Sequence, residues 1–193
     1  MDRLWEIWQS GGWVMLPLFV LAVLLYAQAF QLVMYLRRTN LSGKDEMRWR
    51  EWVSLPERAE GRVAEIIRYT QSDASSVKQV RNRFEEVHLA LVALIERRAR
   101  FLGTLVTAAP LLGLLGTVLG MLKTFFGISS SAGSETAGVI AGGISEALVT
   151  TEAGLMIALP GLFLVMIIQR QRHNLEARLA RLESLTLSQL KVE

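Results

Sequence analysis

The sequence predicts an all-α membrane protein with three transmembrane helices. Hydrophobic residues make up 51% of the 193 residues, which is high for a soluble domain of this size. Two apolar runs, Trp13–Leu36 and Phe101–Leu122, contain no charged residue over 24 and 22 positions. A third, Ala137–Ile168, extends over 32 residues and is interrupted by Glu146 and Glu152. Since about 20 helical residues cross the hydrocarbon core of a bilayer, each run is long enough to span it.

The positions of the basic residues predict the orientation of the chain. Of the 21 Lys and Arg, 14 lie between Arg37 and Arg100 and five follow Ile168, which leaves only Arg3 and Lys123 elsewhere. By the positive-inside rule, residues 37–100 and 169–193 are expected to be cytoplasmic, and the N-terminus to be periplasmic. The basic excess therefore reflects membrane topology rather than binding of nucleic acid.

Residues 1–12 are expected to form a periplasmic segment and residues 13–36 the first transmembrane helix. The start of the chain carries acidic as well as basic residues, and the first apolar run is too long for a signal-peptide core. We therefore expect this helix to remain as an uncleaved anchor. Its strongly polar residues are Gln28 and Gln31 alone, so it should face lipid or pack peripherally.

Residues 37–100 are expected to form a cytoplasmic helical region that is too short and too charged for a large independent core. A polar helix is predicted over 44–69, interrupted near Pro56. No Gly or Pro occurs between Val77 and Gly103, so one long helix is predicted from about Ser75 to about Ile128. It includes the second transmembrane helix, 101–128, with Pro110 as the position of any kink.

Residues 129–136 (SSSAGSET) are predicted to form a short periplasmic turn, with Ser134 as the cap of the third transmembrane helix, 137–168. The helix is expected to continue into a cytoplasmic C-terminal helix, 169–193. Its stripe of Leu175, Leu179, Leu182 and Leu190 predicts packing against the other cytoplasmic helices.

Small residues recur along the second and third spans. They include Gly113, Gly116 and Gly120 in one, and Gly143 and Gly154 in the other. Small residues let membrane helices approach closely. We expect these two spans to form the inner packed layer of an oligomer, with contacts mainly between subunits.

Glu146 is the main candidate for a functional residue. A carboxylate inside a membrane helix costs about 2.5–3.5 kcal/mol on insertion scales, and such residues are functional by default. Counting residues from the span borders places Lys123 level with Glu146, so a static ion pair or a headgroup-facing carboxylate are alternatives to a proton-handling role.

Other polar residues lie at related depths. The same counting places Thr117 and Thr151 at nearly the same height, while Thr150 shares the helix face of Glu146. Glu152 is deeper and has no obvious cationic partner, so it should be protonated or face water.

Several chemistries lack their residues in this sequence. Without cysteine there is no disulfide, thiolate metal site or cysteine catalysis. No Ser-His-Asp set, metal-spaced His cluster or phosphate loop is present, so neither an enzyme nor a bound cofactor or metal is expected. His88 and His173 lie among charged residues and are expected to be solvated.

Two motifs carry a family resemblance. PLLGLLGTVLG (110–120), followed by Phe125, and GISEALVTTEAGLMIALP (143–160) resemble the signature of the MotA/TolQ/ExbB proton-channel superfamily, in particular its ExbB/TolQ branch. The three spans and the cytoplasmic segments agree with that layout. Glu152 and Lys123 depart from it, since members usually have uncharged residues there, and the choice between ExbB and TolQ stays open.

The resemblance implies a pentameric ring of inner-membrane subunits around the helices of a dimeric ExbD- or TolR-like partner. A membrane aspartate of that partner carries protons, and the resulting motion acts on a TonB- or TolA-like protein that reaches the outer membrane. Thr117, Glu146 and Thr151 are implied to belong to the proton pathway, and Thr150, Glu152 and Lys123 either to it or to the structure around it. The ring is implied to be shaped by Pro110, Gly113, Gly116, Gly120, Gly143, Gly154 and Pro160.

The sequence leaves two functional hypotheses. The first is a proton-conducting motor subunit; the second is a non-conducting oligomeric scaffold that anchors a partner. A carboxylate and two threonines at comparable depth favour the first, because a scaffold gains nothing from polar groups there.

Overall fold

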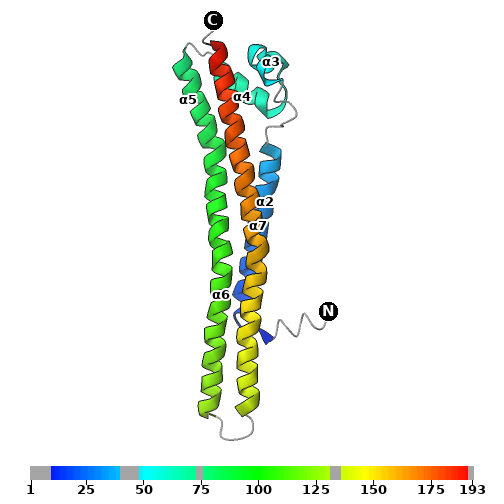
Figure 1. Cartoon of the computed structure of the whole chain (residues 1–193), viewed down its shortest axis with the longest axis vertical. Helices are drawn as coiled ribbons and strands as arrows, with labels where there is room; N and C mark the ends of the chain where they lie inside the picture. Colours follow the sequence, from blue (N-terminus) through cyan, green and yellow to red (C-terminus); the bar gives the residue numbers. More distant parts are fainter. Residues whose placement is uncertain (1–9, 40–47, 73–75, 131–135, 191–193) are drawn as a thin grey trace. The chain divides into compact units, whose positions relative to one another are not determined.

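The computed structural model describes residues 10–39, 48–72, 76–130 and 136–190, and all regular secondary structure in these ranges is helical (Figure 1). The helices are α2 (Met15–Thr39), α3 (Trp49–Ser54), the short 3₁₀ helix η2 (Pro56–Arg58), α4 (Gly61–Gln71), α5 (Val77–His88), the π-helical segment η3 (Leu89–Ala93), α6 (Leu94–Ser130) and α7 (Thr136–Leu190). They divide between two compact units. The first unit contains the chain up to Phe30 together with Arg100–Met166, and the second contains Gln31–Ala99 together with the chain from Ile167.

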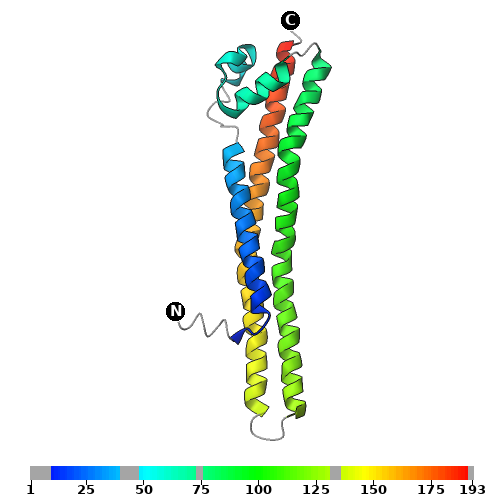
Figure 2. The same cartoon turned by 180° about the vertical axis from the view of Figure 1, so that it is seen from behind.

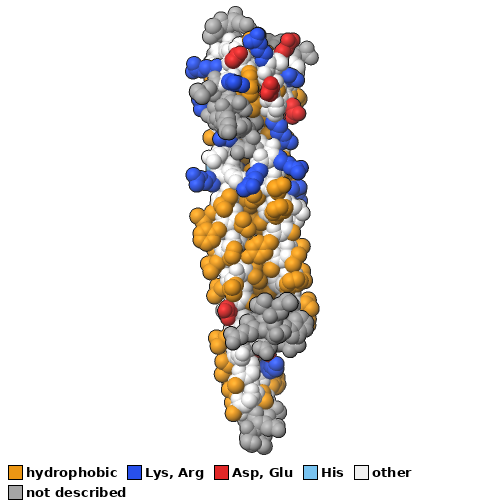
Figure 3. All heavy atoms as spheres, turned by 90° about the vertical axis from the view of Figure 1, so that its right-hand side faces the viewer, with side chains coloured by type: hydrophobic (Ala, Val, Ile, Leu, Met, Phe, Trp, Pro, Cys, Tyr) orange, Lys and Arg blue, Asp and Glu red, His pale blue; other side chains and the backbone are white. Residues whose placement is uncertain are grey.

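Three helices are long and apolar enough to cross a membrane: Met15–Thr39, Val77–Ser129 and Ala137–Gln189. The expected all-helical fold with three helices able to span a membrane is therefore confirmed. The surface supports the same conclusion, since large hydrophobic side chains such as Phe19, Leu148 and Phe163 are exposed in the first unit, and Figure 3 shows one face rich in such side chains. An apolar surface of this extent suits contact with lipid or with other membrane helices.

In the first unit, α2 packs through one face. Leu18, Leu21, Leu25 and Ala29 recur every three or four residues and are buried, as expected of a helix with one apolar contact face. The Tyr26 hydroxyl donates a 3.1 Å hydrogen bond to the carbonyl oxygen of Ile157 in α7. The sequence predicted that this span faces lipid or packs peripherally. In the structure it packs against α7 and is joined to it by this hydrogen bond.

α6 and α7 lie side by side in the first unit in both views (Figures 1 and 2). Glycines on each helix meet the other helix so closely that an added Cβ would clash. At Gly154 it would come within 2.8 Å of the Ala109 carbonyl oxygen, and at Gly120 within 2.7 Å of the Gly143 carbonyl oxygen. The expectation that these small residues pack mainly between subunits is wrong for this set, because α6 and α7 of one chain already fill the contact.

The predicted long helix is present, with one irregularity. Ser76 caps α5 by accepting a 3.3 Å hydrogen bond from the Gln79 amide. The helix then passes through η3 into α6, which continues through Pro110 to Ser130. The π-helical segment was not expected. α7 also runs on past Ile168 to Leu190, as predicted, whereas Ser134 lies outside the described residues.

The second unit has a buried core, and Leu175, Leu179 and Leu182 of the predicted leucine stripe belong to it, as expected. Trp49 and Ile67 are fully buried, and so are Leu175 and Leu182 from α7. The apolar face of the C-terminal part of α7 therefore contributes to this core. Leu175 and Leu182 belong to the same unit as Trp49 and Ile67, although they lie more than 100 positions away in the chain. The predicted polar helix is divided into α3, η2 and α4, with one break near Pro56 and another before Gly61, whose φ is +69°.

Candidate functional site

An ion pair between α6 and α7 forms the centre of the candidate site. Lys123 Nζ lies 2.6 Å from Glu146 Oε2, within the first unit. The side chains differ in exposure, since 64% of Lys123 is exposed but only 17% of Glu146. The predicted equal height of the two residues is confirmed, and the contact itself is a direct charge-assisted hydrogen bond.

The carboxylate of Glu146 is also approached closely by Gly12. Gly12 has a φ of +63°, a conformation that favours glycine. A Cβ on Gly12 would lie 2.5 Å from Glu146 Cδ and would overlap Oε1. Sequence reasoning missed this contact, although the Gly11–Gly12 pair directly before the first apolar run was a signal for a turn.

Buried hydroxyls line the contact between the two helices. Thr150 is fully buried and donates to the carbonyl oxygens of Glu146, at 3.1 Å, and Ala147, at 3.0 Å. Thr124, which was not singled out from the sequence, is also buried and donates to the Gly120 carbonyl oxygen at 3.0 Å. These hydroxyls satisfy backbone carbonyls, as is usual in membrane helices.

Thr151 and Thr117 come close in height without being hydrogen-bonded to each other. Thr151 Oγ1 donates to the Gly113 carbonyl oxygen on α6 at 3.2 Å, and Gly113 is one helical turn before Thr117. Thr117 donates to the Leu114 carbonyl oxygen of its own helix at 2.7 Å. Glu146, in contrast, points to Lys123 and Gly12, so the structure does not bring its carboxylate together with either threonine.

A family model for the MotA/TolQ/ExbB proton channel family matches residues 58–181, which include α6 and most of α7. The chain belongs to this family. The matched region carries every candidate polar residue of α6 and α7, and the three apolar helices make this member a multi-pass membrane protein.

Individual relatives carry ExbB and TolQ names. The chain is 31% identical to an ExbB-like 1 biopolymer transport protein of Synechocystis over 170 residues, which cover 81% of this chain and 67% of the relative. It is 49% identical to the biopolymer transport protein exbB1 of Vibrio cholerae over 61 residues, and 41% identical to the Tol-Pal system protein TolQ of Haemophilus influenzae over 66 residues. These two matches cover 32% and 34% of this chain, and 27% and 28% of the relatives' own lengths.

In this member of the MotA/TolQ/ExbB family, Glu152 lies in a different environment from Glu146, which is paired with Lys123. It is exposed on α7 and has neither a hydrogen bond nor an ion pair among the described residues. Its neighbours one turn away, Leu148, Leu155 and Met156, are exposed as well. This face of α7 is therefore open to contact with lipid or with another helix.

The two prolines lie inside long helices of the first unit. Pro110 is half-buried in α6 and Pro160 is exposed in α7, and neither interrupts its helix.

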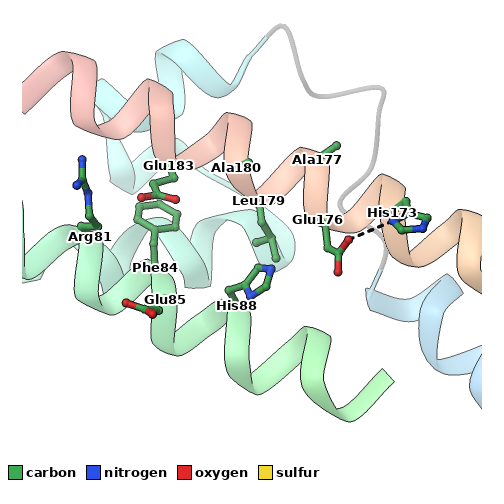
Figure 4. Close-up of a pocket in the computed structure, with 10 residues that line it drawn as sticks. All are labelled: Arg81, Phe84, Glu85, His88, His173, Glu176, Ala177, Leu179, Ala180 and Glu183. Atoms are coloured by element: carbon green, nitrogen blue, oxygen red, sulfur yellow. Dashed lines mark hydrogen bonds and ion pairs between the residues drawn. The ribbon is translucent and has the colours of Figure 1, made fainter. Parts of the chain in front are cut away.

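The second unit of the ExbB-like chain has a groove of about 640 Å³ between α5 and the C-terminal part of α7 (Figure 4). Phe84 and Leu179, which line the groove, are buried. His88 and His173 also line it and are exposed to solvent, as the sequence predicted. His173 Nδ1 lies 3.3 Å from Glu176 Oε2, yet no metal-binding cluster of His, Asp or Glu occurs among the described residues.

Glu176 titrates below its ordinary range. Burial alone would raise its pKa, but hydrogen bonds and charges from Arg172 and His173 outweigh burial and leave the pKa lowered. Arg172 Nε lies 2.9 Å from Glu176 Oε1 on the next turn of α7. This cluster stabilises the C-terminal part of α7 and is separate from the ion pair of the first unit.

Proposed function

We propose that this protein is an inner-membrane proton-channel and motor subunit. Together with an ExbD- or TolR-like partner, it converts the proton motive force into mechanical work on a TonB- or TolA-like protein. The relatives named ExbB and TolQ support this proposal, as does family membership over residues 58–181.

The observation that carries the proposal is the ion pair between Lys123 and Glu146. A charged pair in an apolar helix contact is costly to maintain. The two side chains are enclosed unequally, since Glu146 is largely covered while Lys123 is mostly exposed. An exposed lysine can leave the carboxylate, so the pair can open, and an open Glu146 can accept a proton.

The arrangement in the membrane follows from the charge distribution. Residues 1–12 and 129–136 face the periplasm, and residues 37–100 and 169–193 face the cytoplasm. The spans lie within 13–36, 101–128 and 137–168.

Five copies of the chain form a ring around the membrane helices of a partner dimer. Thr117 lies beside a shallow hollow of about 290 Å³ on α6, formed with Val118, Met121 and Phe125 among its lining residues. A partner helix with a membrane aspartate placed at this height meets hydroxyls from Thr117 and Thr151. Such hydroxyls offer a protonated carboxyl group a polar site inside an apolar ring.

A non-conducting scaffold is the second candidate, and the same ion pair is the observation that favours it. A 2.6 Å contact between a lysine and a carboxylate is also what a static structural pair looks like. In that case the pair fixes α6 on α7, and the protein only anchors its partner.

Glu146→Gln and Lys123→Gln, alone and combined, distinguish the two functions. Gln keeps the size and hydrogen bonding of Glu but cannot carry the titratable proton. For a proton-handling role, Glu146→Gln assembles normally and loses gradient-dependent transport, and adding Lys123→Gln does not restore it. Transport that returns in the double variant shows that the pair is structural and contradicts the proton role of Glu146.

A further inference from the structure

The Gly11–Gly12 turn, defined by those two residues, lies directly on α7 at the level of Glu146. At Gly12, even a methyl group would overlap the Glu146 carboxylate. At Gly11, an added Cβ would lie 3.2 Å from Cγ1 of Val149, one turn further along α7. Only residues without a side chain let the backbone approach α7 this closely.

The turn is fixed in place by the start of α2. The Met15 amide donates to the Gly12 carbonyl oxygen at 3.3 Å. Val14, Met15 and Leu18 then form a buried cluster, and the partly buried Leu112, Ala153 and Ile157 pack against it. Because α6 and α7 both contribute to this packing, the turn cannot move from Glu146 without disturbing the anchor of α2.

The exposed fractions of the Lys123 and Glu146 side chains indicate that the turn helps to enclose the Glu146 carboxylate. Lys123 leaves 64% of its side chain exposed, so it contributes little to enclosing the carboxylate, of which 17% is exposed. Gly12 approaches Cγ, Cδ and Oε1 of Glu146, while Oε2 is the atom that meets Lys123. One carboxylate oxygen is therefore directed toward the turn and the other toward the lysine.

We propose that Gly12 is a positioning residue for Glu146: the Gly11–Gly12 turn holds the carboxylate in the orientation that pairs it with Lys123. The importance of this role for transport rests on the proposed function, but the positioning itself does not. The Gly11–Gly12 turn is thereby part of the ion-pair site, although it lies more than 100 residues from both partners along the chain.

Gly12→Ala tests the positioning, with Gly61→Ala as its matched control. Both glycines have a positive φ, of +63° and +69°, but an added Cβ on Gly61 would meet nothing within 4 Å. The control therefore introduces the same kind of backbone strain without the contact. Asn tolerates a positive φ better than Ala, so Gly12→Asn and Gly61→Asn provide a second pair if Gly12→Ala does not insert.

The readout is acylation of Lys123 by a water-soluble N-hydroxysuccinimide ester, measured by mass spectrometry on the protein in detergent. An amine held by a carboxylate reacts more slowly than an unpaired amine, and Glu146→Gln sets the unpaired rate. We expect the Gly12 variants to react several-fold faster than the wild type, close to the rate of Glu146→Gln, and the Gly61 variants to match the wild type. Equal rates in the Gly12 and Gly61 variants overturn the proposal.

Gradient-dependent transport, measured on the same variants, separates this inference from the proposed function. Fast acylation with loss of transport in the Gly12 variants supports both. Fast acylation with normal transport supports the positioning role but contradicts the use of the pair in proton transfer.

Discussion

At the residue scale, the close approach of α6 and α7 depends on positions where no side chain fits. A Cβ on Gly116 would lie 2.5 Å from the Cβ of Thr150 and 2.9 Å from its Cγ2. Thr150 is fully buried and hydrogen-bonded to its own helix, so it has no room to yield.

Gly116→Ala is expected to destabilise the protein by about 1–3 kcal/mol, the usual cost of overpacking. Gly103→Ala, where an added Cβ would meet nothing within 4 Å, is the matched control. It should be neutral or stabilise the helix by up to about 1 kcal/mol, because Ala is a better helix former than Gly. Thermal unfolding in detergent measures the stability of both variants. Equal unfolding midpoints for Gly116→Ala and Gly103→Ala would contradict the tight contact between Gly116 and Thr150.

A second residue-scale prediction concerns Glu176, whose folded-state pKa lies below its ordinary value. A lowered pKa contributes stability above the unfolded-state pKa, and this stability is lost as the pH falls through the folded-state value. Thermal stability should therefore decrease as the pH falls from about 5 to about 3, and less so in Glu176→Gln. Arg172→Gln removes the main partner and should flatten the pH dependence in the same way; an unchanged slope in both variants contradicts the assignment.

At the element scale, η3 places one extra residue between the buried positions of the long helix. Leu89–Ala93 is π-helical, and a π-helical turn holds more residues than a regular α-helical turn. Phe84, before this segment, and Val92, within it, are both buried. The π-helical segment absorbs the extra residue and keeps both side chains on the core face.

Deleting the exposed Ala90 should therefore be tolerated, because Phe84 and Val92 then have the spacing of two regular helical turns. Inserting an alanine after Ala90 should not be tolerated, because it rotates α5 by about 100° relative to α6. Circular dichroism and thermal unfolding in detergent measure both changes. Similar losses in the two variants would show that η3 does not set the register.

The same scale shows what the sequence could predict. Long apolar runs and helical periodicity sufficed for the spans and for the continuation of α7, and counting along antiparallel helices sufficed for Lys123 and Glu146. The leucine stripe of α7 indicated its buried face. The residues that this face meets in the second unit, and the contact at Gly12, are distant in the chain, so local pattern could not reveal them. The π-helical segment carries no Gly or Pro to mark it.

At the scale of the whole molecule, the glycine contacts are satisfied within one chain, so they do not by themselves require an oligomer. The exposed faces of α6 and α7 remain available for other helices. We expect a pentamer, and native mass spectrometry in a mild detergent measures it; a stable monomer contradicts the proposed ring.

The partner should lie against the Thr117 side of α6. The chain has no cysteine, so a single cysteine at position 117 gives a specific crosslink. Crosslinking to an ExbD- or TolR-like helix is expected from Thr117→Cys and not from Phe19→Cys, an exposed position on α2. Crosslinks found only from α2 would place the partner outside the ring.

The contact between Gly12 and Glu146 also has an evolutionary consequence. In homologues that retain the carboxylate, a side chain at the position of Gly12 would push the end of the acidic side chain away from the lysine. Substitution of the glycine is therefore expected only after the acidic residue has been replaced by a shorter one. The two positions should therefore change together, and in that order, in any lineage that has lost the pair.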